Sequence, residues 1–166
     1  MVTVITGGRI ERPISVVQSH FVDFEHHVRQ KVHPGLALRI LSQERGEQRI
    51  EQTVKMLGLR LKDELVVRQL PDGSVLETVV AGANLGGSIH IGFREDGTNA
   101  TFVYITVRVP AEGWKARVAP LLKVGLLLAA NQTLAEDRRD LEAGNYYPKM
   151  SEVTVEPLRT RSTLAT

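Results

Sequence analysis

The middle of the chain alternates apolar and polar side chains with a period of two. Six stretches follow this pattern for much of their length: 37–44, 48–57, 59–68, 75–82, 87–94 and 100–109. Such alternation is typical of β-strands with one buried face. The connections are short and rich in turn residues, so the pattern predicts an antiparallel meander and not a parallel sheet with long crossovers. A further strand is expected at 2–5.

Two helical regions flank these strands. The first follows Pro13 and is expected to run to about Val32, before the helix-breaking sequence His33-Pro34-Gly35. The second is expected from about Trp114 to Ala143. Apolar residues recur along it at intervals of three and four, which predicts one apolar stripe packed on the sheet. The stripe consists of Leu122, Leu126, Ala130, Leu134 and Leu141.

The composition is that of one compact domain. The chain has 166 residues, enough for one core; the domain is expected at 1–148, with a polar, mobile tail at 149–166. The net charge is only +2 and the basic residues are scattered, so nucleic acid is not an expected partner. The absence of cysteine excludes disulfides, thiolate metal sites and cysteine-ligated iron–sulfur clusters. No apolar run has the length of a membrane span or signal peptide, so a cytoplasmic location is expected.

The order of the expected elements resembles a known superfamily. A strand, a helical pair, a six-stranded meander and a long C-terminal helix occur in that order in START domains, polyketide cyclases and birch-pollen-allergen-like proteins, the SRPBCC superfamily. The resemblance covers about residues 1–143. It implies the helix-grip fold, an α+β architecture in which a curved antiparallel sheet of six to seven strands wraps a long C-terminal helix. It also implies a cavity for a hydrophobic molecule of lipid, polyketide or aromatic type.

Several residues are candidates for contact with such a ligand. They are Leu61, Asp63, His90, Leu122, Leu126 and Ala130. Asp63 shares its strand face with Leu61, which predicts a position in the cavity; a place at the sheet edge is the alternative. His90 is either a hydrogen-bonding group of the cavity or a residue of the sheet surface. The space between helix and sheet is expected to hold a cavity of roughly 300 Å³ or more.

Four of the five histidines lie in one segment, from His20 to His33. Histidine is a common metal ligand and proton carrier, so this density points to a candidate site. On a continuous helix, His26 and His33 share one face, and His20, Asp23 and His27 share another. Each set is a candidate metal site, and the alternative is a solvated polar face.

Part of this segment resembles the catalytic domain of Rieske-type ring-hydroxylating oxygenases, itself a helix-grip domain. Their early helix carries Asn-x2-Asp-x2-His-x4-His, and Asp23-x2-His26 with the later His33 is similar to it. The stretch at 135–143, Ala-Glu-Asp-Arg-Arg-Asp-Leu-Glu-Ala, places Asp137 at the family's carboxylate ligand. The resemblance implies His26, His33 and Asp137 as a 2-His-1-carboxylate site for one Fe(II), Mn(II) or Zn(II) ion.

The chain departs from the oxygenase pattern in three ways. Six residues, not four, separate His26 from His33, which leaves His27 as the substitute partner in a more compact arrangement. His20 stands where the family has asparagine. The absence of cysteine also means that the chain has no Rieske electron-delivery centre of its own.

Asp137 is a candidate on independent grounds, because it falls among the apolar residues of the stripe. A carboxylate is costly there unless it is paired or bound to a metal; the alternatives are a partner for a cavity Arg or His, or a solvated helix end. Glu136 and Asp140 are expected on the polar side. Two hypotheses follow: a carrier or sensor of a hydrophobic molecule, or a metal-dependent oxygenase-like or cyclase-like enzyme acting on an aromatic or polyketide substrate.

Overall fold

Seven strands form one antiparallel sheet in the computed structural model, which describes residues 1–44, 46–56 and 58–148. The strands are β1 (Val2–Ile10), β2 (Leu36–Glu44), β3 (Glu47–Met56), β4 (Leu59–Gln69), β5 (Val75–Gly82), β6 (Ser88–Glu95) and β7 (Thr101–Val109). Their spatial order is β1-β7-β6-β5-β4-β3-β2. The predicted meander is confirmed, and β1 extends five residues further than expected. The tail predicted at 149–166 lies outside the described residues.

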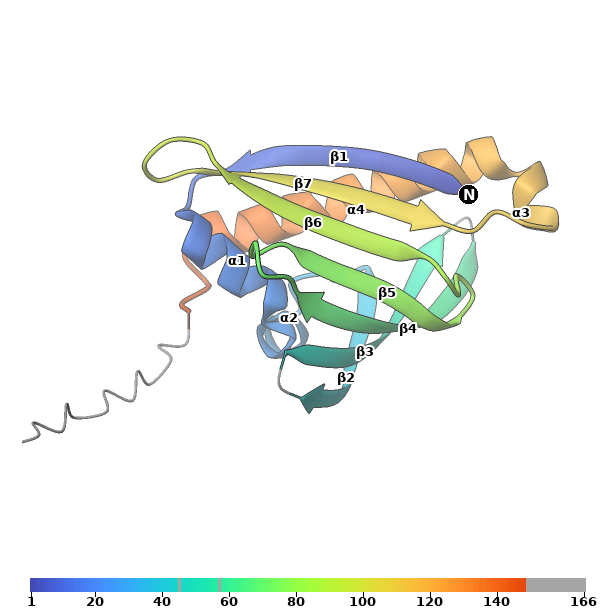
Figure 1. Ribbon diagram of the computed structural model, residues 1–166, viewed down its shortest axis with the longest axis horizontal. Coiled ribbons are helices and arrows are strands. Elements are labelled where there is room, and N and C mark those ends of the chain that lie inside the picture. Colours follow the sequence, from blue (N-terminus) through green and yellow to red (C-terminus); the bar gives the residue numbers. More distant parts are fainter. Residues whose placement is uncertain (45, 57, 149–166) are drawn as a thin grey trace, which may run out of the picture.

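The sheet curves around one long helix. The helices are α1 (Ile14–Val22), α2 (Phe24–Gln30), α3 (Trp114–Arg117) and α4 (Ala119–Glu142). Figure 1 shows α4 running lengthwise along β1 and β7, with α1 and α2 near its C-terminal end and α3 at the other end. This is the predicted helix-grip fold. No helix within the described ranges is both long and apolar enough to cross a membrane.

The first helical region is two helices, as the helical pair of the superfamily implies, and it ends at Gln30, two residues before the expected limit. The continuous helix considered for the histidines is wrong. Asp23 ends α1 with φ −89° and ψ 73°, and its side chain accepts a hydrogen bond from the backbone N–H of His26 at 3.0 Å. Aspartate favours this position because it satisfies an otherwise unpaired N–H of the first helical turn. His33 lies beyond α2, after Lys31 with φ 52°. His26 and His33 therefore do not share a helical face.

The second helical region also begins differently from the prediction. A single turn, α3, precedes α4, and Val118 between them has φ −106° and ψ 14°. Pro120 lies in the first turn of α4, where a residue without an N–H is tolerated. From there α4 continues through Gly125 to Glu142 without a break.

The core lies between the concave face of the sheet and the apolar stripe of α4. Leu122, Leu134 and Leu141 are buried, and Leu126 and Ala130 are partly buried against the same core. This confirms the stripe predicted from the sequence. Between its last two leucines, the C-terminal half of α4 turns carboxylates inward, and this is where the candidate site lies.

Candidate functional site

A cavity of about 180 Å³ lies between the sheet and α4. Most of its wall is aliphatic, with Leu126 and Ala130 on the helix side. It is smaller than the predicted 300 Å³, because Phe21 and Phe24 of the two short helices and branched side chains of the sheet occupy part of the space. Asp137 is one of the polar residues on its wall.

The structure places the six candidate ligand contacts in two groups. Asp63, Leu126 and Ala130 line the cavity, whereas Leu61, His90 and Leu122 are not among its lining residues. Leu122 belongs to the packed core. The Nε2 of His90 lies 3.2 Å from the hydroxyl of Ser74. Its two strand neighbours, both isoleucine, line the cavity, so alternation directs the His90 ring to the other face of the sheet.

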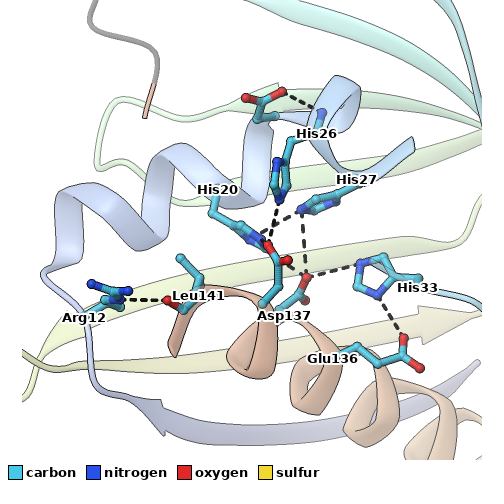
Figure 2. Close-up of polar contacts among 10 residues, drawn as sticks. Arg12, His20, His26, His27, His33, Glu136, Asp137 and Leu141 are labelled. Atoms are coloured by element: carbon cyan, nitrogen blue, oxygen red, sulfur yellow. Dashed lines mark hydrogen bonds and ion pairs between the residues drawn. The ribbon is translucent and has the colours of Figure 1, made fainter. Parts of the chain in front are cut away.

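The four clustered histidines converge on the C-terminal half of α4, as Figure 2 shows. The Nε2 atoms of His20 and His26 lie 3.0 and 2.7 Å from the same oxygen, Oδ2 of Asp140. An ionised carboxylate only accepts hydrogen bonds, so both nitrogens donate. The remaining nitrogen of His20, Nδ1, then carries a lone pair and faces Asp137.

Three potential ligand atoms lie close together beside the cavity. The Nε2 of His27 is 3.4 Å from the Nδ1 of His20, and each of these nitrogens is 3.9 Å from Oδ1 of Asp137. Ligands about 2.1 Å from a tetrahedral metal are roughly 3.4 Å apart, so a small contraction would bring this set to metal-binding distances. Oδ1 of Asp137 is buried and makes no hydrogen bond within the described part of the chain.

His33 approaches the same oxygen from the loop after α2. Its Nε2 lies 3.2 Å from Oδ1 of Asp137, but the geometry is not that of a hydrogen bond. Its Nδ1 lies 3.0 Å from Oε2 of Glu136. Gln132 donates a hydrogen bond to the other oxygen of Glu136 at 2.9 Å. Burial lowers the pKa of His33, but the contacts with Asp137 and Glu136 outweigh it and raise the pKa to about 9.

The pKa values of His20 and His27 shift in the opposite direction to that of His33. Burial lowers the pKa of His20, and burial together with the neighbouring histidines holds the pKa of His27 well below its ordinary value. Both rings are therefore neutral near pH 7, the form in which imidazole binds metals. Burial favours the neutral form of Asp140, but hydrogen bonds from His26 and His20 lower its pKa overall.

The structure brings together two of the three predicted metal ligands. His33 and Asp137 are in contact, whereas His26 binds Asp140. His20 and His27 lie beside Asp137 instead, because the break at residue 23 changes the direction of the chain between α1 and α2 and brings the two rings together. In a straight helix these two residues would be about 10 Å apart along the axis. Metal binding itself stays a prediction.

Sequence reasoning missed three carboxyl groups. Asp140, expected on the polar side, is buried, and Glu136 is bound to His33. The spacing of three between Asp137 and Asp140 was the available signal, since such residues are neighbours on a helix surface. Glu77 also lines the cavity, and its place between Val75 and Val79 in an alternating strand would have predicted its inward direction.

The fold has many relatives among solved structures, although the sequence matches no family model and no curated protein. A protein of Thermus thermophilus superposes with a TM-score of 0.77 and 13% identity, covering 87% of this chain and 99% of that chain. The ZhuI aromatase/cyclase of Streptomyces sp. R1128 gives 0.70 and 15%, covering 87% and 98%. A START superfamily protein of Mycobacterium smegmatis gives 0.66 and 14%, covering 84% and 99%.

The fold is START-like. At these identities the likeness concerns the fold alone, and it agrees with the SRPBCC resemblance of the sequence. These neighbours give no support to the resemblance to Rieske-type oxygenases.

Proposed function

We propose that this protein binds a hydrophobic small molecule in the cavity, beside a mononuclear divalent metal ion. The observation that carries the proposal is Oδ1 of Asp137, a buried carboxylate oxygen without a hydrogen bond among the described residues. A buried carboxylate is strongly destabilising unless hydrogen bonds or a cation compensate it. His33, protonated below its pKa of about 9, lies 3.2 Å away and compensates part of this charge, and a metal ion would compensate the rest. The nearby nitrogens of His20 and His27 could bind the same divalent metal ion as this oxygen.

The proposed ligands are Nδ1 of His20, Nε2 of His27 and Oδ1 of Asp137. Two imidazoles and one carboxylate suit Fe(II), Mn(II) or Zn(II) and leave coordination positions open for water or another ligand. Asp140 would fix the tautomer of His20, as carboxylates beside metal-bound histidines commonly do. His33, held by Glu136, would orient the carboxylate of Asp137 from the cavity side.

Isothermal titration of Fe(II) and Zn(II) under anaerobic conditions tests the metal site. We expect His27→Ala and Asp137→Ala to bind each metal at least 100-fold more weakly than wild type, because each removes a direct ligand. His90→Ala is the control, since this fifth histidine lies apart from the cluster and contacts Ser74. Equal affinity in wild type and both ligand variants would exclude the site.

The pair His20→Ala and His26→Ala distinguishes this ligand set from the one that the sequence resemblance implies. We expect His20→Ala to bind each metal at least 100-fold more weakly than wild type, because it removes a direct ligand. For His26→Ala we expect the smaller, 10- to 100-fold loss typical of residues that support a ligand, because in the proposed site His26 contacts Asp140 and is not itself a ligand. The reverse order would favour the predicted set of His26, His33 and Asp137.

Binding of the hydrophobic molecule is tested by filling the cavity. Ala130 lines it, so Ala130→Trp should weaken binding of an apolar fluorescent probe at least tenfold, about 1.4 kcal/mol. Leu128→Trp is the matched control two residues away on the same helix, because Leu128 is 64% exposed and lies outside the cavity. Unchanged probe binding in a folded Ala130→Trp variant would contradict the placement.

One observation favours a second candidate function, a metal-dependent oxygenase-like or cyclase-like enzyme. His27 and Asp137 belong both to the proposed metal site and to the cavity wall, so a bound molecule would lie beside the metal. Without cysteine, the chain would need a partner protein or reductant to supply electrons to an oxygenase. Ligand conversion by the Fe(II)-loaded protein with reductant and oxygen would support this function, and recovery of the bound ligand unchanged would favour a carrier.

A further inference from the structure

Glu77 is a buried carboxyl group on the sheet side of the cavity. It lies on the inward face of β5, between Val75 and Val79, and only 8% of the residue is exposed. Its partners in the sheet register are Val67 on β4 and Ile89 on β6. The side chain lines the cavity, and its neighbours on the strand and in the sheet register are aliphatic.

Nothing in the described part of the chain makes a hydrogen bond or ion pair with Glu77. This sets it apart from Asp63, the other carboxylate on the sheet side, which accepts hydrogen bonds from the backbone N–H and the side chain of Asn84 at 2.8 and 2.7 Å. Buried polar groups are rarely left without a partner, and one that faces a cavity is commonly met by water or a ligand. Burial and the charge of Asp137, opposed by His33, raise the pKa of Glu77 to about 7.

We infer that Glu77 is the polar anchor of the ligand site and selects small apolar ring compounds that carry one hydroxyl group. The inference rests on the proposed ligand-binding function and names the class of ligand. A hydroxyl both donates and accepts, so it pairs with either protonation state of the carboxyl group. Binding sites of this kind use a few polar groups to fix the orientation of an otherwise apolar ligand.

The size of the cavity limits the ligand to one or two rings. An aliphatic cavity of roughly 150 Å³ admits benzene, and this cavity measures about 180 Å³. With its hydroxyl on Glu77, such a ring would contact the valine and isoleucine side chains of the sheet. Sites built to bond a hydroxyl discriminate strongly against the analogue that lacks it, because the buried partner is then left unpaired.

The experiment compares 2-naphthol with 2-methylnaphthalene, which have the same ring system and nearly the same shape. Each is titrated into the full chain, with and without a chelator, so that coordination of the naphthol by a metal is recognised. The quantity measured is the ratio of the two dissociation constants. We expect wild type to prefer 2-naphthol at least tenfold more strongly than Glu77→Leu does, and Glu77→Gln to keep most of the preference because an amide still forms hydrogen bonds.

Thr78→Val is the matched control, because Thr78 is adjacent on β5 and faces the other side of the sheet. It should leave the ratio unchanged. An equal ratio in wild type and Glu77→Leu, with both probes still bound, would overturn the anchor role while leaving the proposed cavity function standing. Absence of binding of both probes to wild type would overturn both. Should Glu77→Leu not fold, Glu77→Met is judged by the same ratio.

Discussion

Asp140 and Glu77 are buried to a similar extent yet differ in what surrounds them. The exposed fractions of the two residues are 9% and 8%, although Glu77 lies deeper in the protein. Oδ2 of Asp140 accepts hydrogen bonds from two imidazoles, and these hold its pKa below the ordinary value despite burial. Glu77 has no such donors, and burial raises its pKa to about 7. Depth of burial and available hydrogen-bond donors together set the pKa of each carboxyl group.

The difference follows from where the two residues stand. In the interior of a sheet the backbone N–H groups are used by the ladder, so a strand carboxyl has no local donor. Asp63 is paired because Asn84, in the loop after β5, donates two hydrogen bonds to it. On the helical side, the break at Asp23 turns histidines of α1 and α2 toward α4. Asp140 on the helical side is thus paired with imidazoles, whereas Glu77 on the sheet side has no hydrogen bond or ion pair within the described residues.

The largest expected effect comes from removing Asp140, the paired carboxyl group. Asp140→Ala would leave two buried imidazole N–H groups without acceptors, at about 1–3 kcal/mol each, so the free energy of unfolding should fall by about 4 kcal/mol. Urea denaturation at pH 7 measures it. Glu64→Ala removes a carboxylate of an exposed pair with Arg49, 3.1 Å apart, and should cost less than about 1 kcal/mol. Similar losses in the two variants would contradict the importance of the buried pairing.

Removing the charge from the unpaired carboxyl should have a pH-dependent effect. The pKa of Glu77 rises from 4.5 to about 7 on folding, so the folded state binds more protons between these values and stability falls as pH rises. The penalty is absent below pH 4.5 and complete above pH 7, at roughly 3 kcal/mol. Asp137 and His33 are the charged groups that act on Glu77.

Glu77→Gln cannot ionise, so its gain in stability over wild type should grow by roughly 3 kcal/mol between pH 4 and pH 8. Denaturant titrations of both proteins across this range measure the difference. A difference that stays constant with pH would show that Glu77 has its ordinary pKa in the folded protein.

The sequence predicted the sheet closely because the signals for strands are local. Alternation and turn residues placed β2 to β7 within about one residue of their observed limits. The inward direction of Leu126, Ala130 and Asp137 also followed from helical spacing alone. The size of the cavity did not follow, because it depends on how Phe21 and Phe24 pack between elements distant in the sequence.

The arrangement of the histidines was harder to predict, because it depends on one backbone break. On a continuous helix Asp23 would be an interior residue, whereas it ends one helix and caps the next. Because of this break, His20 and His27 lie beside Asp137, and His26 contacts Asp140. The burial of Asp140 likewise depends on tertiary packing, since Tyr146 and the short helices cover the end of α4.

The smallest effect is expected from removing one of the two hydrogen bonds that Asp63, the paired carboxyl group of the sheet, accepts. Asn84→Ala removes the side-chain donor to Asp63 but leaves the backbone donor, so it should cost about 2 kcal/mol, as for one hydrogen bond to a charged group. Asn84 also accepts a hydrogen bond from Lys115. Lys115→Ala is therefore the control and should cost about 0.5 kcal/mol or less, as for a surface substitution. Equal losses in the two variants would assign the effect to Lys115 and leave Asp63 no better supported by side chains than Glu77.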